Sequence, residues 1–110
     1  MARAPHYLGP WTRQREPWLF KGKPAHVEDP FLWYENGRVN ALMKDMTGEI
    51  CGEKFGGIHV TSPDGITWDF DRATLAYSRQ LRWSDGRTTR QGFLERPQLL
   101  FEDGKPTHLF

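Results

Sequence analysis

The chain has 110 residues, of which 26% are charged and 37% hydrophobic, and its formal net charge is +1. This length fits a single domain with a modest core, and the balanced charge indicates neither a nucleic-acid-binding surface nor an acidic disordered tail. With 14% aromatic residues, 11 glycines and 8 prolines, the composition favours short strands and turns, so we expect an all-β fold.

The N-terminal segment contains a weak strand pattern. In "LGPWTRQREPWLF", residues 9–11, "GPW", correspond to residues 65–68, "GITW", so this segment looks like a weaker copy of the fourth strand described below. The segment has no apolar core of a signal peptide, and no stretch reaches the ~18 apolar residues of a membrane span. As written, the sequence therefore predicts a cytoplasmic protein with no membrane partner, although a longer parent chain would carry any targeting segment elsewhere.

Residues 28–43, "EDPFLWYENGRVNALM", predict a β-hairpin. An apolar run leads into Asn36-Gly37, a pair that tolerates the positive φ angles of a type I′ turn, and a second run follows. Residues 95–110, "ERPQLLFEDGKPTHLF", repeat this pattern 67 residues later. The shared pattern E-x-P-x-L-x-[YF]-E-[ND]-G-[RK]-x-x-x-L indicates two copies of one structural unit.

Two further strands are expected between the copies. Residues 56–62, "GGIHVTS", predict a strand with Ile58 and Val60 on one face. Residues 63–65, "PDG", predict a turn into a fourth strand over residues 66–70, where large apolar side chains alternate. The order of strands and turns then begins again.

Common ligand sites are not indicated. The glycine-rich residues 45–57 lack the strand-to-helix setting of a phosphate-binding loop, so a long connection is expected there. The four histidines show no close metal-ligand spacing, and the single Cys51 is expected to be an idle thiol. We therefore expect no cofactor.

A four-stranded unit that repeats over this period fits the blade of a β-propeller. The expected organisation is one partial propeller unit over residues 1–110. Residues 1–27 would give the third and outer strands of a preceding blade, residues 28–94 a complete blade, and residues 95–110 the inner hairpin of the following blade. A β-sandwich or a small barrel is the alternative that the turn spacing also permits.

The segments "EDPFLWYENGRVNALMKDM", "SPDGITW" and "LERPQLLFEDGKPTHLF" resemble parts of five-bladed β-propeller glycoside hydrolases of the family 43 type. The likeness runs from about residue 9 to residue 110 and covers the middle part of such an enzyme. It implies hydrolysis of glycosidic bonds in oligo- or polysaccharides, with Glu95 as general acid and Asp29 as the residue that orients the acid and tunes its pKa. It also implies a general base in a blade that precedes residue 1.

Elementary chemistry agrees with carboxylates at these positions. Glycoside hydrolysis needs one carboxylic acid to protonate the leaving oxygen and one carboxylate to activate water. The innermost strands of adjacent blades converge on one axis, which would bring Asp29 and Glu95 together, and crowding of two carboxylates would raise one pKa. Asp29 also departs from the repeat, since Arg96 occupies its place in the second copy, and this departure favours a functional role.

Other residues are candidate contacts to a sugar. Glu28 and Glu95 share one repeat position, so a structural role at the mouth of the blade is the alternative for both. Arg96 is expected to bridge to a pocket carboxylate or to form a salt bridge between blades. His26 precedes Asp29 at the rim and is either a contact to a sugar hydroxyl or a solvated loop histidine. Lys44 and Asp45, which end the second strand, could contact either a neighbouring blade or the substrate.

The tryptophans divide into two groups. Trp33 offers a stacking platform for a sugar ring, and Trp83 lies in a polar loop before Glu95, as a residue of a pocket rim would. Trp11 and Trp68 are expected to pack between blades. His59 is expected in the core.

Two functions of different classes remain open. One is a glycoside hydrolase whose general base is not in this chain, and the other is a non-catalytic carbohydrate-binding or structural propeller module. Carbohydrate is the expected partner in the first and in the binding form of the second. The two ends of the chain are complementary, so we also expect a homo-oligomer in which the hairpin of residues 95–110 from one copy pairs with the N-terminal strands of the next.

Overall fold

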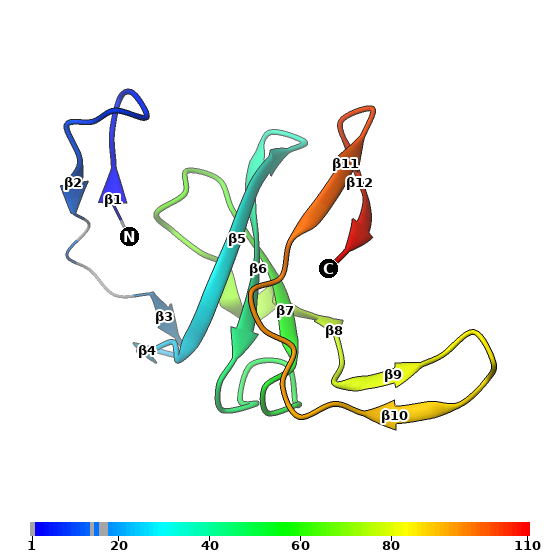
Figure 1. Ribbon diagram of the computed structural model, residues 1–110. Helices are drawn as coiled ribbons and strands as arrows, with labels where there is room; N and C mark the ends of the chain where they lie inside the picture. Colours follow the sequence, from blue (N-terminus) through cyan, green and yellow to red (C-terminus); the bar gives the residue numbers. More distant parts are fainter. Residues whose placement is uncertain (1, 14, 16–17) are drawn as a thin grey trace.

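The central feature of the fold is a four-stranded antiparallel sheet with the strand order β5-β6-β7-β8 (Figure 1). A computed structural model describes residues 2–13, 15 and 18–110. The strands of the sheet are β5 (Val27–Glu35), β6 (Arg38–Asp45), β7 (Gly57–Ser62) and β8 (Thr74–Tyr77). Every strand pairing in the described chain is antiparallel, which confirms the predicted all-β class.

Four two-stranded hairpins flank this central sheet. They are β1 (Ala2–Arg3) with β2 (Thr12–Arg13), β3 (Leu19–Phe20) with β4 (Lys23–Pro24), β9 (Gln80–Arg82) with β10 (Thr88–Arg90), and β11 (Leu99–Glu102) with β12 (Lys105–Leu109). Hairpins β1–β2 and β11–β12 lie on opposite sides of the sheet, and β9–β10 projects from it (Figure 1). The radius of gyration of 15.2 Å therefore exceeds the ~13 Å of a compact domain of this length.

Both predicted hairpins close through the predicted turns. The φ angle is 52° at Asn36 and 73° at Gly37, and 51° at Asp103 and 74° at Gly104, as the positive φ values of a type I′ turn require. A third turn of this kind, which the repeat pattern did not reveal, closes β3–β4 at residues 21–22 with φ of 50° and 74°. Local turn chemistry thus sets three of the hairpins.

Gly37→Ala is expected to lower the free energy of unfolding by about 1 kcal/mol. A Cβ at Gly37 meets no atom within 4 Å, so the loss would come from the strained φ of 73° alone. Gly92→Ala is the matched control, because its Cβ also meets nothing within 4 Å and its φ is not in the left-handed region. Urea denaturation measures both variants, and equal losses would contradict this explanation.

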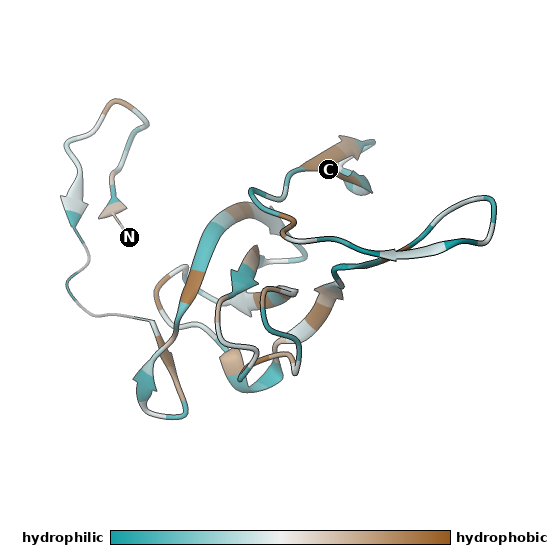
Figure 2. Cartoon of the chain, turned by 60° about the horizontal axis from the view of Figure 1, so that its bottom comes forward, coloured by the Kyte–Doolittle hydropathy of each residue, from teal (hydrophilic) through white to brown (hydrophobic). Residues whose placement is uncertain are grey.

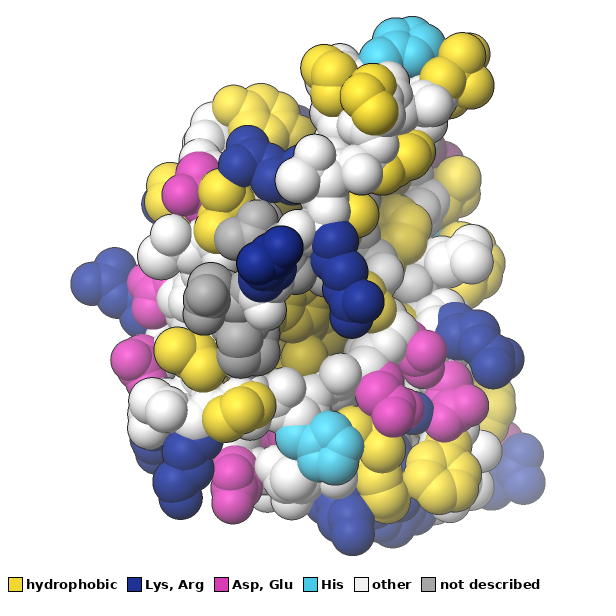
Figure 3. Space-filling view, turned by 90° about the vertical axis from the view of Figure 1, so that its left-hand side faces the viewer, with side chains coloured by type: hydrophobic (Ala, Val, Ile, Leu, Met, Phe, Trp, Pro, Cys, Tyr) yellow, Lys and Arg dark blue, Asp and Glu magenta, His cyan; other side chains and the backbone are white. Residues whose placement is uncertain are grey.

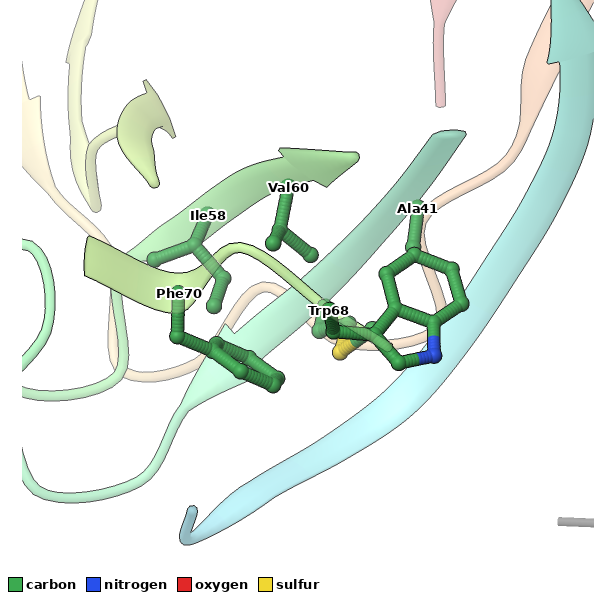
Figure 4. Packing of buried hydrophobic residues seen from close by; sticks show 6 residues of the cluster. Ala41, Ile58, Val60, Trp68 and Phe70 are labelled. Atoms are coloured by element: carbon green, nitrogen blue, oxygen red, sulfur yellow. The ribbon is translucent and has the colours of Figure 1, made fainter. Parts of the chain in front are cut away.

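The hydrophobic core lies on one face of the central sheet (Figure 4). Its buried residues are Ala41, Met43, Ile58, Val60, Trp68 and Phe70. The prediction that Ile58 and Val60 share a buried face is therefore confirmed. Trp68 is 8% exposed, as expected for packing, and its ring lies 5.4 Å from that of Trp18. The Trp11 side chain, in the N-terminal hairpin, is 60% exposed within this chain, so its packing between blades stays a prediction.

The predicted strand over residues 66–70 is absent, because a side chain binds the backbone there. The Asp64 carboxylate accepts hydrogen bonds from the N–H groups of Thr67 and Ile66, both at 2.8 Å, and these bonds lower the pKa of Asp64 to about 2. The chain turns, continues through the short 3-10 helix η1 (Phe70–Arg72), and forms the fourth strand only at β8. The large side chains at 68 and 70 still reach the core.

The connection between β6 and β7 folds around the buried carboxylate of Asp45. Its oxygens accept hydrogen bonds from the backbone N–H groups of Thr47, Gly48, Ile50 and Cys51 at 2.9–3.1 Å. Burial alone would raise the pKa of Asp45, but these hydrogen bonds outweigh burial and hold it below its usual value. Asp45 therefore organises the connection instead of facing a ligand.

Cys51, in the middle of this connection, has an unreactive environment. Burial raises the pKa of the half-buried Cys51 thiol, whose S–H group lies 3.4 Å from the carbonyl oxygen of Glu53, in agreement with an idle thiol.

Figure 2 shows that hairpin β9–β10 is mainly hydrophilic whereas β11 is hydrophobic. No helix in the described part of the chain has the length and apolarity needed to cross a membrane.

Candidate functional site

The face of the sheet opposite the core carries a row of residues that crosses all four strands. Glu28 on β5 pairs with Lys44 on β6, Lys44 with Gly57 on β7, and Gly57 with Tyr77 on β8. Directly paired residues project from the same face of a sheet, so these four positions lie side by side. We call them the Lys44 row.

Three carboxylates surround the ammonium group of Lys44. The Nζ atom lies 2.6 Å from Oε1 of Glu95, 3.2 Å from Oε2 of Glu28 and 3.7 Å from Oδ2 of Asp29. The Lys44 side chain is 3% exposed, whereas those of Glu28, Asp29 and Glu95 are 50%, 27% and 41% exposed. We call these three carboxylates the acidic cluster. Acidic side chains gather in this way around a largely covered basic one in Figure 3.

Asp29 and Arg96 occupy equivalent positions of the sequence repeat, and they contact each other beside Lys44. Asp29 and Arg96 have φ angles of 55° and 54°, and the Arg96 N–H group lies 3.4 Å from Oδ2 of Asp29. The pairing of β5 with β6 shifts register between Glu28 and Phe31, so an irregularity of the strand turns this segment toward Lys44. Positive φ in non-glycine residues is uncommon and costs roughly 1–3 kcal/mol, and such positions gather at functional sites.

The charge of Lys44 is held by its partners. Burial alone would lower the pKa of Lys44, but hydrogen bonds and charges of Glu95 and Glu28 outweigh burial and raise it above 10.5. The ammonium also lies between carboxylates that would otherwise repel one another. The site therefore contains a cation between its carboxylates, which the sequence did not predict.

Loss of the Lys44 charge is expected to weaken the fold at alkaline pH. Because the folded pKa lies above the unfolded value of 10.5, the contribution of Lys44 is complete below pH 10.5 and disappears as pH rises through the folded pKa. Lys44→Met should lower the free energy of unfolding at pH 8 by about 1–2 kcal/mol, a value reduced by the exposure of the carboxylates. Denaturation at pH 8 and pH 11 should show a smaller alkaline decline in this variant than in the exposed control Lys105→Met. Equal declines would refute the role of Lys44.

The other candidate residues lie in different surroundings. Arg96 contacts the acidic cluster through its backbone, and its guanidinium forms no ion pair with the described residues. Trp33 stacks on His59, with centroids 5.3 Å apart, and lies 6.4 Å from Phe101. Trp33 therefore packs hairpin β11–β12 against the sheet. His59, also hydrogen-bonded to Asn40 at 2.9 Å, is half-buried, and burial lowers its pKa.

Two predicted candidates do not contact the acidic cluster in the described structure. The indole N–H group of Trp83 donates to Thr89 Oγ1 at 2.8 Å within the projecting hairpin β9–β10, and the side chain is 47% exposed. His26 is exposed, and its carbonyl oxygen accepts a hydrogen bond from Met46 at 3.0 Å. Neither Trp83 nor His26 therefore lines the pocket beside Glu95.

The geometry defines a partly open site of mixed charge. Carboxylate oxygens accept hydrogen bonds from hydroxyl groups, and the buried Lys44 fixes them in position. The sequence indicates Lys44 only as a minor contact and gives no sign of Gly57 and Tyr77, which join the site through the pairing of β6 with β7 and of β7 with β8. Comparison of the chain with protein-family models, curated proteins and solved structures finds no match.

Proposed function

We propose that the chain forms blades of a β-propeller and that Lys44 and the acidic cluster form a centre for binding and hydrolysing glycosides. In this proposal Glu95 is the general acid and Asp29 is the residue that orients it and tunes its pKa. A further carboxylate that activates water is required, and the resemblance noted above assigns it to a preceding blade.

The arrangement of the central sheet supports the propeller. Strands β5 to β8 form an antiparallel meander of four strands, which is the unit of a propeller blade. One face of the sheet carries the core, and the opposite face receives hairpin β11–β12 through Trp33 and Phe101. Blades pack face to face, so a sheet with packing on both faces fits this architecture.

The observation that carries the functional proposal is the meeting of Asp29 and Glu95 at one ammonium. They are 66 positions apart in the sequence, yet their oxygens lie 3.7 Å and 2.6 Å from the same Nζ atom. An acid catalyst and its modulator need two carboxylates at one site, and the shared contact with Lys44 supplies that arrangement. Both side chains are accessible enough to meet a ligand.

A carbohydrate-binding module without turnover is the second candidate. The observation that favours it is the 2.6 Å contact between Lys44 and Glu95, because Lys44 occupies the carboxyl group that a general acid would turn toward the substrate. Under the hydrolytic proposal, a bound glycoside must weaken this contact before Glu95 can protonate the leaving oxygen.

A screen of aryl glycosides and of plant and algal oligosaccharides tests these candidates. The variants are Glu95→Gln and, as matched control, Glu102→Gln, an exposed glutamate on β11. Turnover that Glu95→Gln removes and Glu102→Gln retains supports hydrolysis with Glu95 as acid. Turnover that both retain removes Glu95 from that role, and binding without turnover by the unmodified protein favours the second candidate.

A further inference from the structure

The Lys44 row contains a gap that the side chain of Tyr77 fills. Gly57 has no side chain, and a Cβ there would overlap three atoms of the Tyr77 ring, Cδ1, Cε1 and Cζ. The ring therefore lies flat over Gly57, and because Gly57 pairs with Lys44 on its other side, the phenol reaches toward the acidic cluster. Burial raises the pKa of Tyr77, and the charges of Lys44, Asp29 and Glu95 also act on it, which agrees with this placement.

The hydroxyl group of Tyr77 is buried and has no hydrogen-bond partner among the described residues. Buried polar groups in proteins are nearly always paired, because an unpaired group loses its bonds to water without replacement. The unpaired hydroxyl lowers stability in the free protein. A role with a ligand would account for its presence.

A pocket with a volume of about 250 Å³ adjoins the acidic cluster. It is lined by Glu95 and Tyr77 and by the apolar residues Leu81, Leu94, Pro97, Leu109 and Phe110. An apolar cavity of about 150 Å³ holds one benzene molecule, so this pocket has room for one substituted aromatic ring. A sugar ring would fit this pocket poorly, because the apolar walls would leave the hydroxyl groups of the sugar unpaired.

We propose that this pocket, the Tyr77 pocket, binds the aromatic ring of an aryl glycoside's leaving group, with the ring's oxygen toward Glu95 and Tyr77. That oxygen supplies the acceptor that the Tyr77 hydroxyl lacks in the free protein. Gly57 is the positioning residue, since only glycine leaves space for the ring of Tyr77. The inference rests on the proposed function, because it names the leaving group for the same site.

The test uses 4-fluorophenol, which contains the ring and its oxygen but no glycosidic bond. Fluorine NMR measures its affinity for the unmodified protein, for Tyr77→Phe, and for the control Tyr34→Phe, whose side chain is 72% exposed. We expect binding that perturbs the methyl signals of Leu81 and Leu94. The affinity should fall about fivefold in Tyr77→Phe, the value of one hydrogen bond, and stay unchanged in the control.

A stability measurement separates ligand binding from a structural role. Because the hydroxyl is unpaired in the free protein, Tyr77→Phe should have an unfolding midpoint equal to or above that of the unmodified protein. Absence of 4-fluorophenol binding, equal affinity in both tyrosine variants, or a lowered midpoint in Tyr77→Phe would overturn the proposal. Failure of glycoside turnover with retained phenol binding would instead count against the proposed hydrolysis alone.

Discussion

Glu95→Gln is expected to lower kcat for an aryl glycoside by about 10²–10⁴-fold, the usual contribution of a general acid. Glutamine keeps the shape of the side chain and can still hydrogen-bond a ligand, but it cannot donate the proton that the leaving oxygen needs. KM should therefore change much less than kcat. Lys44 would keep Glu28 and Asp29 as partners at 3.2 Å and 3.7 Å, so the fold should persist.

The measurement is steady-state hydrolysis of the best aryl glycoside from the screen, with circular dichroism to confirm folding. Glu102→Gln is the control, and its kcat should match that of the unmodified protein. The leaving group offers a further check, because an acidic phenol leaves without protonation. The defect of Glu95→Gln should shrink as the phenol becomes more acidic, and an equal defect for all phenols would count against proton donation.

Asp45→Asn is expected to lower the free energy of unfolding by about 3 kcal/mol at pH 7. The Asp45 side chain is 0% exposed, and its Oδ2 atom accepts hydrogen bonds from Ile50 and Cys51 at 2.9 Å and 3.1 Å. In asparagine, an NH₂ group would replace one acceptor and face backbone donors. Urea denaturation measures the loss, and Glu49→Gln in the same connection is the exposed control.

The pH dependence of Asp45→Asn gives a second readout. Because the folded pKa of Asp45 lies below 3.8, its contribution is complete above pH 3.8 and disappears as pH falls through the folded pKa. The unmodified protein should therefore lose more stability than Asp45→Asn between pH 5 and pH 2. An equal acid-induced loss in both proteins would show that the hydrogen bonds of Asp45 do not lower its folded pKa.

Hairpins and the repeat could be predicted because their causes are local. Asn36-Gly37 and Asp103-Gly104 accept positive φ wherever they occur, so the turns follow from the residues themselves. Equivalent positions of the repeat also have similar backbone conformations, since the φ angles of Asp29 and Arg96 are almost the same. The strand over residues 66–70 failed as a prediction because the Asp64 side chain competes for backbone donors, which hydrophobic periodicity does not detect.

The site could be predicted only in part, because register and long-range packing determine it. A regular ladder from the turn after Glu35 would pair Asp29 with Lys44, whereas the irregularity in β5 pairs Glu28 with Lys44 instead. That shift allows both carboxylates to reach one ammonium. The arrival of Glu95 depends on how the second repeat packs against the first, and the overlap of Tyr77 with Gly57 depends on the pairing of β7 with β8.

The central claim is that Lys44 and the acidic cluster form a carbohydrate site, and an NMR titration with oligosaccharides tests it most directly. The side-chain signals of Lys44, Glu28, Asp29 and Glu95 would be followed, with the carboxyl carbon of Glu102 as an internal control. We predict saturable shifts of the four site signals with at least one oligosaccharide, while Glu102 stays unchanged. Saturable binding that leaves those four signals unmoved, or no binding of any oligosaccharide, would contradict the claim.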